Sequence, residues 1–471
     1  MQRLFIEGEW TEAQSKETFD SLNPADGEVL DTVHSAGLQD VEKAIGAARD
    51  SYHDWTTENV TYRAELLRKY LYKLREEKEN IIELVTKEAG KTLAESRGEV
   101  EDALNLIDYL VGEGKRYFGY VAPSTQKNRL AYTQRCAYGV AALLTPWNFP
   151  VSILAWKMAP ALLCGNTVVI KPSSETPLTA GALVSCAEDI FPSGVINLVT
   201  GRGKAIGDRL ISHRWVDIIS FTGSTEIGRK IRDGAGLKEV GLELGGKNPA
   251  LIMPSTDIKK AVEDTVKGAF GVAGQRCTAT SRVIVHEDII DEFRDALLER
   301  TKGLTVGNGM DAETDMGPLI NESHAGIVHS YVEEAVEEGG RLLCGGKALE
   351  RTGNYYLPTV LDGLSTEMRI AQEEVFGPVL CLFACSSFDE GVEIANDVPY
   401  GLSASIYTAD LEEAFRGTNE LASGIVVVNN PPGAVEAHLP FGGVKESGIG
   451  REGGIEGIDE FSRTKTVYID Y

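Results

Sequence analysis

Between residues 139 and 246, short apolar runs alternate with segments of helical periodicity, and this alternation constrains the fold more than any other feature. Strands are predicted over 139–144, 167–170, 196–199 and 217–221. Helices are predicted to begin near Pro150, Thr176-Pro177, Gly203 and Ser224, one after each strand. Strand–helix repetition at this spacing is typical of a parallel, doubly wound sheet. The chain is therefore expected to be an α/β protein.

The alternation starts again after about residue 246, which predicts a second α/β domain; 471 residues are enough for two domains of ordinary size. Its strands are expected at 283–285, 379–383, 402–407 and 425–428, and its helices at 256–270, 288–300, 321–338 and 409–420. Residues 38–112 read mainly as helix, with Asp40 as the first N-cap. The run 465–471 alternates like a strand and is expected to pair with a distant segment or another subunit.

The composition narrows the class of protein. Lys and Arg number 46 against 71 Asp and Glu, a formal net charge of −25, which argues against a general nucleic-acid binder. No segment reaches the roughly 18 apolar residues needed to cross a bilayer, and the N-terminus has no signal-type apolar stretch. The seven Cys and seven His show no metal-type spacing, so we expect a reduced, cytoplasmic protein without a metal site. Most of the His residues are expected on the surface or in loops, and none is expected to be catalytic.

Two residues are suited to covalent chemistry on a carbonyl group. Cys277 lies among small residues, which suggests a tight loop, and the adjacent Arg276 would favour a thiolate nucleophile. The alternative is a buried, inert thiol. Glu243 precedes Gly245 and Gly246, so little side-chain bulk shields it, and it would suit a general base. The alternative is an exposed loop carboxylate.

Two further segments lie where ligands bind in open α/β sheets. Residues 221–228 follow an apolar strand and open a helix, which offers backbone N–H groups and the Ser224 hydroxyl to a pyrophosphate. The turn is not the standard glycine fingerprint, and the turn at 201–207 is a competing candidate. Asn148 lies just past a strand end, and its amide would suit an oxyanion. The alternative for the two glycine-containing turns is that they only reverse the chain, and the alternative for the Asn148 segment is a loop with a structural role.

Taken together and in this order, these segments resemble the aldehyde dehydrogenase superfamily over essentially the whole chain. The segments that carry the resemblance are 145–150, 171–177, 221–228, 243–247, 274–277, 373–378 and 440–443. The resemblance implies three parts. They are a Rossmann-like cofactor domain over 1–117 and 138–246, a catalytic domain over 247–446, and a small β oligomerisation arm over 118–137 and 460–471. A homodimer or homotetramer is implied as well.

The resemblance also implies catalytic roles. Cys277 attacks the aldehyde, the Cys277 N–H and the Asn148 amide hold the oxyanion, and Glu243 activates water to hydrolyse the thioester. Lys157 and Glu452 match family positions that support a proton relay. The base at Glu243 favours hydrolysis over transfer of the acyl group to coenzyme A. The intact Cys277, Glu243 and Asn148 argue against a non-catalytic relative.

A nicotinamide cofactor is implied, with Glu374 on its ribose and Phe376 beside its ring. NADP is favoured over NAD because Ser174 stands where NAD-selective members often carry Glu, which leaves Lys171 free to pair with a 2′-phosphate. Arg202 or Lys204 would add a second positive group, whereas Glu175 is close enough to oppose it. The full set of expected cofactor positions is Thr145, Trp147, Lys171, Ser173, Ser174, Gly203, Gly207, Phe221, Gly223, Ser224, Glu243, Leu244, Gly245, Glu374 and Phe376.

The substrate signals point in two directions. The run 274–282 and the segments 112–114 and 123–125 are similar to those of 2-oxoglutarate semialdehyde (2,5-dioxopentanoate) dehydrogenases. The segments 437–441 and 450–452 look more like those of relatives that act on aromatic aldehydes such as benzaldehyde or vanillin, or on lactaldehyde. The loop residues Val435 and His438 are expected to touch the substrate. The expected partner is a small aldehyde.

Overall fold

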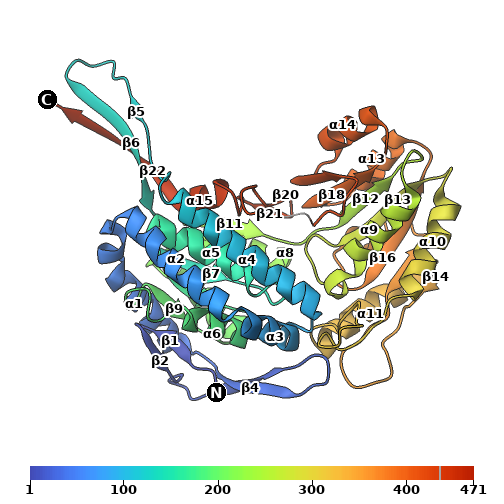
Figure 1. Ribbon diagram of the computed structural model, residues 1–471, viewed down its shortest axis with the longest axis horizontal. Coiled ribbons are helices and arrows are strands. Elements are labelled where there is room, and N and C mark those ends of the chain that lie inside the picture. Colours follow the sequence, from blue (N-terminus) through green and yellow to red (C-terminus); the bar gives the residue numbers. More distant parts are fainter. Residues whose placement is uncertain (434–435) are drawn as a thin grey trace.

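The computed structural model describes residues 1–433 and 436–471 (Figure 1). Two large sheets, each covered by helices, form the two sides of the molecule, and a three-stranded arm projects from one end (Figure 1). The predicted α/β class is confirmed. Within the described residues, no helix combines the length and the apolar character that crossing a membrane requires.

The first sheet has eight strands in the order β2-β1-β9-β8-β7-β10-β11-β21. Strands β7 to β11 pair in parallel, and β1, β2 and β21 pair antiparallel at the edges. Every residue of β7 and β8 is buried, as expected for parallel strands covered on both faces. The bounds are β1 (Leu4–Ile6), β2 (Glu9–Thr11), β7 (Val140–Leu144), β8 (Thr167–Lys171), β9 (Ile196–Leu198), β10 (Val216–Thr222), β11 (Glu239–Glu243) and β21 (Gly448–Ile449).

A helix follows each of the four predicted strands of this sheet, and four more helices precede β7. The former are α5 (Ser152–Cys164), α6 (Pro177–Ser185), α7 (Gly203–Ser212) and α8 (Thr225–Ala235), and the latter are α1 (Leu38–Thr57), α2 (Val60–Glu76), α3 (Lys78–Ala89) and α4 (Leu93–Glu113). The predicted N-cap of α1 was wrong. Gly37 is the N-cap, and the Asp40 carboxylate, one turn further in, accepts a hydrogen bond from the Gly37 N–H at 2.9 Å. Asp40 therefore closes the helix start from the third helical position.

The second sheet has seven strands in the order β14-β15-β16-β13-β12-β18-β19, all parallel except the β14–β15 pair. The strands predicted here are found, and β12, β14 and β15 are additional. The bounds are β12 (Asn248–Ile252), β13 (Thr280–His286), β14 (Arg341–Cys344), β15 (Thr359–Asp362), β16 (Val379–Cys385), β18 (Ser403–Tyr407) and β19 (Ile425–Val428). Its helices are α9 (Ile258–Phe270), α10 (Ile290–Lys302), α11 (Glu322–Glu337), α12 (Arg369–Gln372), α13 (Phe388–Asn396) and α14 (Leu411–Glu420).

The projecting arm contains β5 (Val121–Ala122), β6 (Arg129–Ala137) and β22 (Ser462–Asp470) in the order β22-β6-β5. The predicted C-terminal strand pairs with a distant segment of the same chain, in register from Ser462 opposite Ala137 to Asp470 opposite Arg129. The short helix α15 (Glu456–Glu460) leads into it. The remaining elements are the hairpin β3 (Thr18–Leu22) and β4 (Val29–His34), the pair β17 (Tyr400–Gly401) and β20 (Val444–Lys445), and the 3-10 turn η1 (Gly271–Gly274).

Candidate active site

A cleft with an empty volume of about 900 Å³ is lined by loops from both sheets. It brings together many residues that the sequence singled out, which lie far apart along the chain. From the first sheet come Pro146, Trp147, Asn148, Thr222, Gly223, Ser224, Leu244 and Gly245, and from the second side come Cys277, His324, Ile327, Tyr331, Glu374, Val375 and Phe376. The other expected site residues lie behind this lining or further along the first sheet.

On the first-sheet side, the cleft ends at the turn between β10 and α8. Ser224 is the N-cap of α8, and its hydroxyl accepts a hydrogen bond from the Ile227 N–H at 3.4 Å. A Cβ on Gly223 would lie less than 3.0 Å from the Phe221 ring, so a side chain there would displace the ring. The first N–H groups of a helix have no intrahelical partner and attract anions. This turn is therefore suited to a pyrophosphate group.

On the opposite side, a strained turn precedes Cys277. Val272, Ala273 and Gly274 have φ angles of 55°, 54° and 69°, a left-handed conformation that costs a non-glycine residue about 1–3 kcal/mol. The Glu95 carboxylate on α4 accepts the Val272 N–H at 2.6 Å. The Gln275 amide donates to the Val272 carbonyl at 3.1 Å and accepts the Ile320 N–H at 2.9 Å. A side chain on Gly274 would collide with the Gly377 carbonyl. Contacts from distant segments thus hold the strained turn.

The backbone around Cys277 is fixed by two asparagines. The Asn248 amide donates to the carbonyls of Cys277 and Ala279 at 2.7 and 2.9 Å. The Asn148 amide donates one hydrogen to the Gln275 carbonyl at 3.0 Å, which leaves its second N–H available to an oxyanion. Asn248 was not predicted as a site residue, because an Asn at a strand start carries no local signal.

The Cys277 thiol is less acidic than the sequence suggested. Burial raises its pKa to about 12, and the charges of Glu374 and Glu243 act in the same direction, while Arg276 opposes them. The expected effect of Arg276, which favours a thiolate, is present but is not the dominant one. Burial and two carboxylates outweigh one guanidinium.

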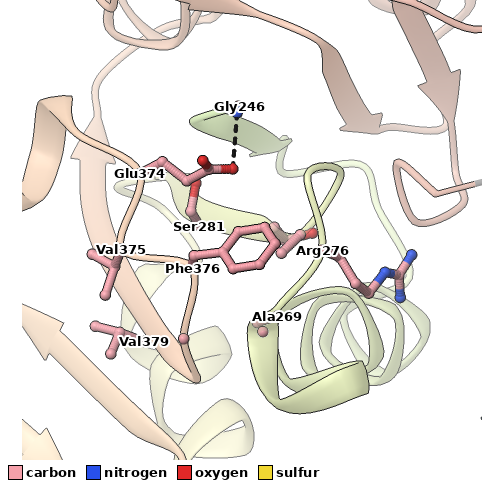
Figure 2. Close-up of a pocket in the computed structure, with 12 residues that line it drawn as sticks. Gly246, Ala269, Arg276, Ser281, Glu374, Val375, Phe376 and Val379 are labelled. Atoms are coloured by element: carbon pink, nitrogen blue, oxygen red, sulfur yellow. Dashed lines mark hydrogen bonds between the residues drawn. The ribbon is translucent and has the colours of Figure 1, made fainter. Parts of the chain in front are cut away.

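An aromatic cluster forms the wall beside Glu374. The Trp147 ring lies edge-on to the Phe376 ring at 5.4 Å and to the His324 ring at 5.7 Å. The His324 Nε2 lies 2.7 Å from the Phe376 carbonyl. Glu374 accepts the Gly246 N–H at 3.0 Å, as Figure 2 shows, and burial raises the pKa of Glu374 to about 7.

His324 was missed by the sequence analysis, since a His in the first turn of a helix gives no pattern that distinguishes it from a surface residue. His34, at the end of β4, is an exception to the expectation that most His residues lie on the surface or in loops, whereas His213 lies in the loop between α7 and β10. Both of these side chains are buried.

Glu243 lies behind the cleft rather than in its lining. It is the last residue of β11 and is buried, and a Cβ on Gly442 would lie less than 3.0 Å from its carboxylate. Burial, and next the charge of Glu452, raise the pKa of Glu243 well above its usual range. The fully buried Lys157 on α5 forms an ion pair with Glu452. The structure thus brings Glu243, Glu452 and Lys157 together.

The expected adenosine end of the cofactor site lies along the ends of β8 and β9. Lys171, the last residue of β8, is buried and donates to the Pro172 carbonyl at 2.6 Å, and burial lowers the pKa of Lys171 to about 8. A Cβ on Gly203 would lie 4.0 Å from Lys171 Cε. Arg202 and Lys204 are exposed beside it.

The other expected residues of this region make local contacts. The Ser173 hydroxyl accepts the Glu175 N–H at 3.2 Å, and the Glu175 carboxylate accepts a hydrogen bond from Asn321 at 3.2 Å. Ser174 is half-buried and Gly207 on α7 has open space around it. The Thr145 N–H donates to the Lys171 carbonyl at 3.2 Å.

Of the two loop residues expected to touch the substrate, Val435 lies outside the described residues, and His438 is exposed beside Glu436. In the described part of the chain, no three His, Cys, Asp or Glu side chains are grouped as metal ligands.

Comparison with known proteins gives one consistent result. The model of the "Aldehyde dehydrogenase family" matches residues 10–467. An alpha-ketoglutaric semialdehyde dehydrogenase of Bacillus subtilis is 41% identical, covering 99% of this chain and 97% of that protein. An alpha-ketoglutarate semialdehyde dehydrogenase of Haloferax volcanii is 40% identical over 99% of this chain and 98% of that one. A solved betaine aldehyde dehydrogenase of Staphylococcus aureus in complex with NAD⁺ superimposes with a TM-score of 0.98 at 38% identity, covering 100% of this chain and 95% of that one.

Proposed function

The chain belongs to the aldehyde dehydrogenase family and is an NAD(P)⁺-dependent enzyme, and we propose that its substrate is a small semialdehyde with a carboxylate, such as 2-oxoglutarate semialdehyde. The observation that carries this proposal is the position of Arg276 beside Cys277. The relatives named above support it, since two of them are dehydrogenases of that semialdehyde.

Arg276 has the character of an anion-binding residue. Its Nε has no hydrogen-bond partner among the described residues, and a Cβ on Gly271 would lie 3.1 Å from its Nη1. The Arg276 side chain extends away from Glu374 and Phe376 (Figure 2). An aldehyde bound at Cys277 would meet Arg276 on the side opposite the nicotinamide, where a remote carboxylate would form a charge-assisted hydrogen bond.

We assign the chemistry as follows. Cys277 adds to the aldehyde carbon, and the Cys277 N–H and the free Asn148 N–H stabilise the oxyanion of the resulting thiohemiacetal. The bound nicotinamide supplies the hydride acceptor. Glu243 then takes a proton from the water that attacks the Cys277 thioester. The raised pKa of Glu243 makes its carboxylate a stronger proton acceptor, which suits a general base.

The residues present fit a nicotinamide cofactor. The helix start at Ser224 offers N–H groups to a pyrophosphate, and Trp147 and Phe376 provide flat apolar surfaces. A Cβ on Gly245 would lie less than 3.0 Å from the Glu374 carboxylate, so the glycine keeps that acceptor uncovered for ribose hydroxyls. Leu244 and Phe221 are the remaining apolar residues expected to contact the cofactor.

The substrate proposal is tested by kcat/KM for 2-oxoglutarate semialdehyde, benzaldehyde and lactaldehyde. Arg276→Gln is expected to lower the value for the semialdehyde by about ten- to a hundredfold, since a charge-assisted hydrogen bond is worth about 1.5–3 kcal/mol. The value for benzaldehyde should change little. Arg97→Gln, at an exposed position on α4, is the matched control for this substrate panel. A wild type that prefers benzaldehyde or lactaldehyde would instead favour the second candidate, to which the segment 437–441 points.

Hydrolysis, rather than acyl transfer to coenzyme A, is tested at Glu243. Glu243→Gln is expected to release one burst of reduced cofactor and then stall at the thioester. An unchanged steady-state rate would mean that another group activates the water.

We propose NADP⁺ as the preferred cofactor. Lys171 lies beside Gly203 at the start of α7, next in the chain to the exposed Arg202 and Lys204, and these cations would attract a 2′-phosphate. The Glu175 carboxylate, which would oppose it, accepts a hydrogen bond from Asn321. The ratio of kcat/KM for NADP⁺ and NAD⁺ in the wild type and in Ser174→Glu tests this. We expect the variant to lose about ten- to a hundredfold of the preference. A wild type that strongly prefers NAD⁺, with the variant unchanged, would refute the role of Ser174.

We also propose that the protein is a homodimer or homotetramer assembled through the arm, with domain limits as expected from the sequence. The arm exposes large apolar side chains, among them Phe118, Tyr120, Val121 and Tyr468. In the described sheet, β22 and β5 are edge strands, and such edges are usually covered in native proteins. Light scattering that reports a stable species of 51.0 kDa would contradict this assembly.

A further inference from the structure

We propose that Ser220 and Glu460 extend the buried pair of Lys157 and Glu452 into a path that carries the proton from Glu243 to the molecular surface. The inference rests on the proposed role of Glu243 as the base in thioester hydrolysis. Ser220 and Glu460 are not among the residues that the sequence singled out.

Hydrogen bonds and an ion pair link four of these groups. Glu243 is near them, since the charge of Glu452 contributes to its raised pKa, and its Oε2 has no hydrogen-bond partner among the described residues. Lys157 forms its ion pair with Glu452 and also donates to the Ser220 hydroxyl at 3.0 Å. The Ser220 hydroxyl in turn donates to the Glu460 carboxylate at 2.8 Å. The four side chains come from α5, β10, α15 and the segment after β21. Such convergence of polar groups in a core is unusual unless each has a partner.

The backbone leaves room for the Glu460 carboxylate. Gly241 on β11 is paired in register with Ser220 on β10, and a Cβ at Gly241 would lie less than 3.0 Å from Glu460 Oε1. A Cβ at Gly450 would lie 3.6 Å from Glu460 Oε2. The carboxylate therefore lies in a cradle bordered by two glycines, which a side chain at position 241 would fill.

The path runs from buried to accessible groups. Lys157 and Ser220 are fully buried and Glu452 nearly so, whereas Glu460 is only half-buried. Burial, and next the charge of Glu452, raise the pKa of Glu460 to about 7, with Lys157 opposing and Glu239 adding to the rise. A group that titrates near neutrality is suited to pass a proton to water. Arg451 and Tyr138 are the other titratable groups near the two ends of the path.

The proton balance closes over the hydrolysis of the thioester. Water loses a proton to Glu243 as its oxygen bonds to the thioester carbon, and the Cys277 thiolate leaves. The proton passes from Glu243 to Glu452. The Lys157 ammonium gives one proton to Ser220 and takes one from Glu452, while the Ser220 hydroxyl passes its own proton to Glu460. Glu460 releases a proton to bulk water, and every group of the path returns to its starting state. The proton of the product carboxylic acid returns the Cys277 thiolate to the thiol, and the product leaves as a carboxylate.

A purely structural role for Glu460 predicts different behaviour. In that case Glu460 would only balance the charge of the buried Lys157, and its loss would lower stability. Neither the buffer dependence nor the pH profile of hydrolysis would then change. The test therefore measures proton transfer and not only activity.

The experiment follows decay of the acyl-enzyme by intact-protein mass spectrometry after acid quench, at several pH values and at low and high concentrations of imidazole buffer. Glu460→Gln is expected to keep the burst of reduced cofactor, to hydrolyse the thioester about tenfold more slowly in dilute buffer, and to recover in concentrated buffer. Ser220→Ala and Gly241→Ala should behave similarly. The matched control is Glu456→Gln, which removes a half-buried carboxylate from the same helix, α15.

Two outcomes would overturn the path. The first is unchanged acyl-enzyme decay in both Glu460→Gln and Ser220→Ala. The second is slower decay that concentrated buffer does not restore. A wild type that forms no acyl-enzyme would instead overturn the proposed function, and the path with it, so the two failures are distinguished by the wild-type measurement.

Discussion

The turn after β10 and the turn after α9 both end at the cleft, yet different kinds of contact stabilise them. The first, at Gly223 and Ser224, is closed by its own neighbours: Ser224 caps the helix that it begins. The second, at 272–274, has three left-handed residues in succession. It is held by Glu95 from α4 and by Gln275, whose amide reaches Ile320.

This difference in contacts matches a difference in role: the first turn is suited to binding the cofactor, and the second holds the nucleophile. A turn that offers N–H groups to an anion needs only a helix start and a glycine, both of which are local. A turn that presents a nucleophile must hold one atom against strain, so its supports come from several segments. Substitutions in the two turns should therefore affect different steps of the reaction.

The largest effect on turnover is expected when the Cys277 thiol, which the second turn presents to the cleft, is removed. Cys277→Ala should fold and bind cofactor, yet lose turnover by about four orders of magnitude or more, because no other group forms the covalent adduct. Steady-state cofactor reduction measures the loss, and cofactor titration by fluorescence checks binding. Cys344→Ala, which removes a half-buried thiol on β14, is the control. Near-normal turnover in Cys277→Ala would refute the assignment.

A pair of glycine variants compares the two turns directly. Gly274→Ala places a Cβ against the Gly377 carbonyl at a φ of 69°, and backbone cannot move aside cheaply. We expect kcat to fall by about a hundredfold or more, as for a misplaced catalytic group. Gly223→Ala meets the far end of the Phe221 side chain and no backbone atom, so the ring must shift rather than the backbone, and we expect mainly a higher KM for the cofactor. Equal effects of the two substitutions on kcat would contradict the assignment of cofactor binding to one turn and of nucleophile positioning to the other.

The sequence predicted well the elements that depend on local residues, and poorly the elements that depend on contacts with distant segments. The strands β7, β8 and β10 are apolar runs buried on both faces, and the helix after each begins where Pro, Gly or Ser indicates. By contrast, β1 and β21 are very short and exist through pairing with β9 and β11, which lie far away along the chain. No local pattern encodes such pairing.

The residues of the site also fall into those that the sequence predicted and those that depend on contacts in the folded chain. Cys277, Asn148 and Glu374 were predicted and line the cleft, because family resemblance carries their positions. Glu95, Asn248 and His324 support the cleft through contacts that exist only in the folded chain. The groups that dominate the pKa of Cys277 could not be predicted, for the same reason. Arg276 is adjacent in sequence, but burial and the carboxylates of Glu374 and Glu243 dominate and arise from the fold.

A smaller effect is expected from pH at the wall between the two turns. The pKa of Glu374 is raised to about 7, so below that pH the carboxyl is protonated and loses an acceptor for ribose hydroxyls. The Kd for NAD⁺ should rise as pH falls below about 7, approaching tenfold per pH unit. NAD⁺ is used because it lacks a 2′-phosphate that would titrate nearby. Glu374→Gln should remove this dependence, and a pH-independent wild type would contradict the role of Glu374.

The smallest effect is expected at the cap of α8. Ser224→Ala removes the acceptor for the Ile227 N–H, a loss of about 1 kcal/mol for a typical N-cap, which corresponds to about fivefold in cofactor affinity if the helix start must be ordered for binding. The kcat should not change, because the Cys277 turn is held independently. Ser224→Asn keeps a cap acceptor and should restore the affinity, as measured by cofactor titration. If Asn binds as weakly as Ala, the hydroxyl contacts the cofactor directly, and the first turn contributes more than a local helix start.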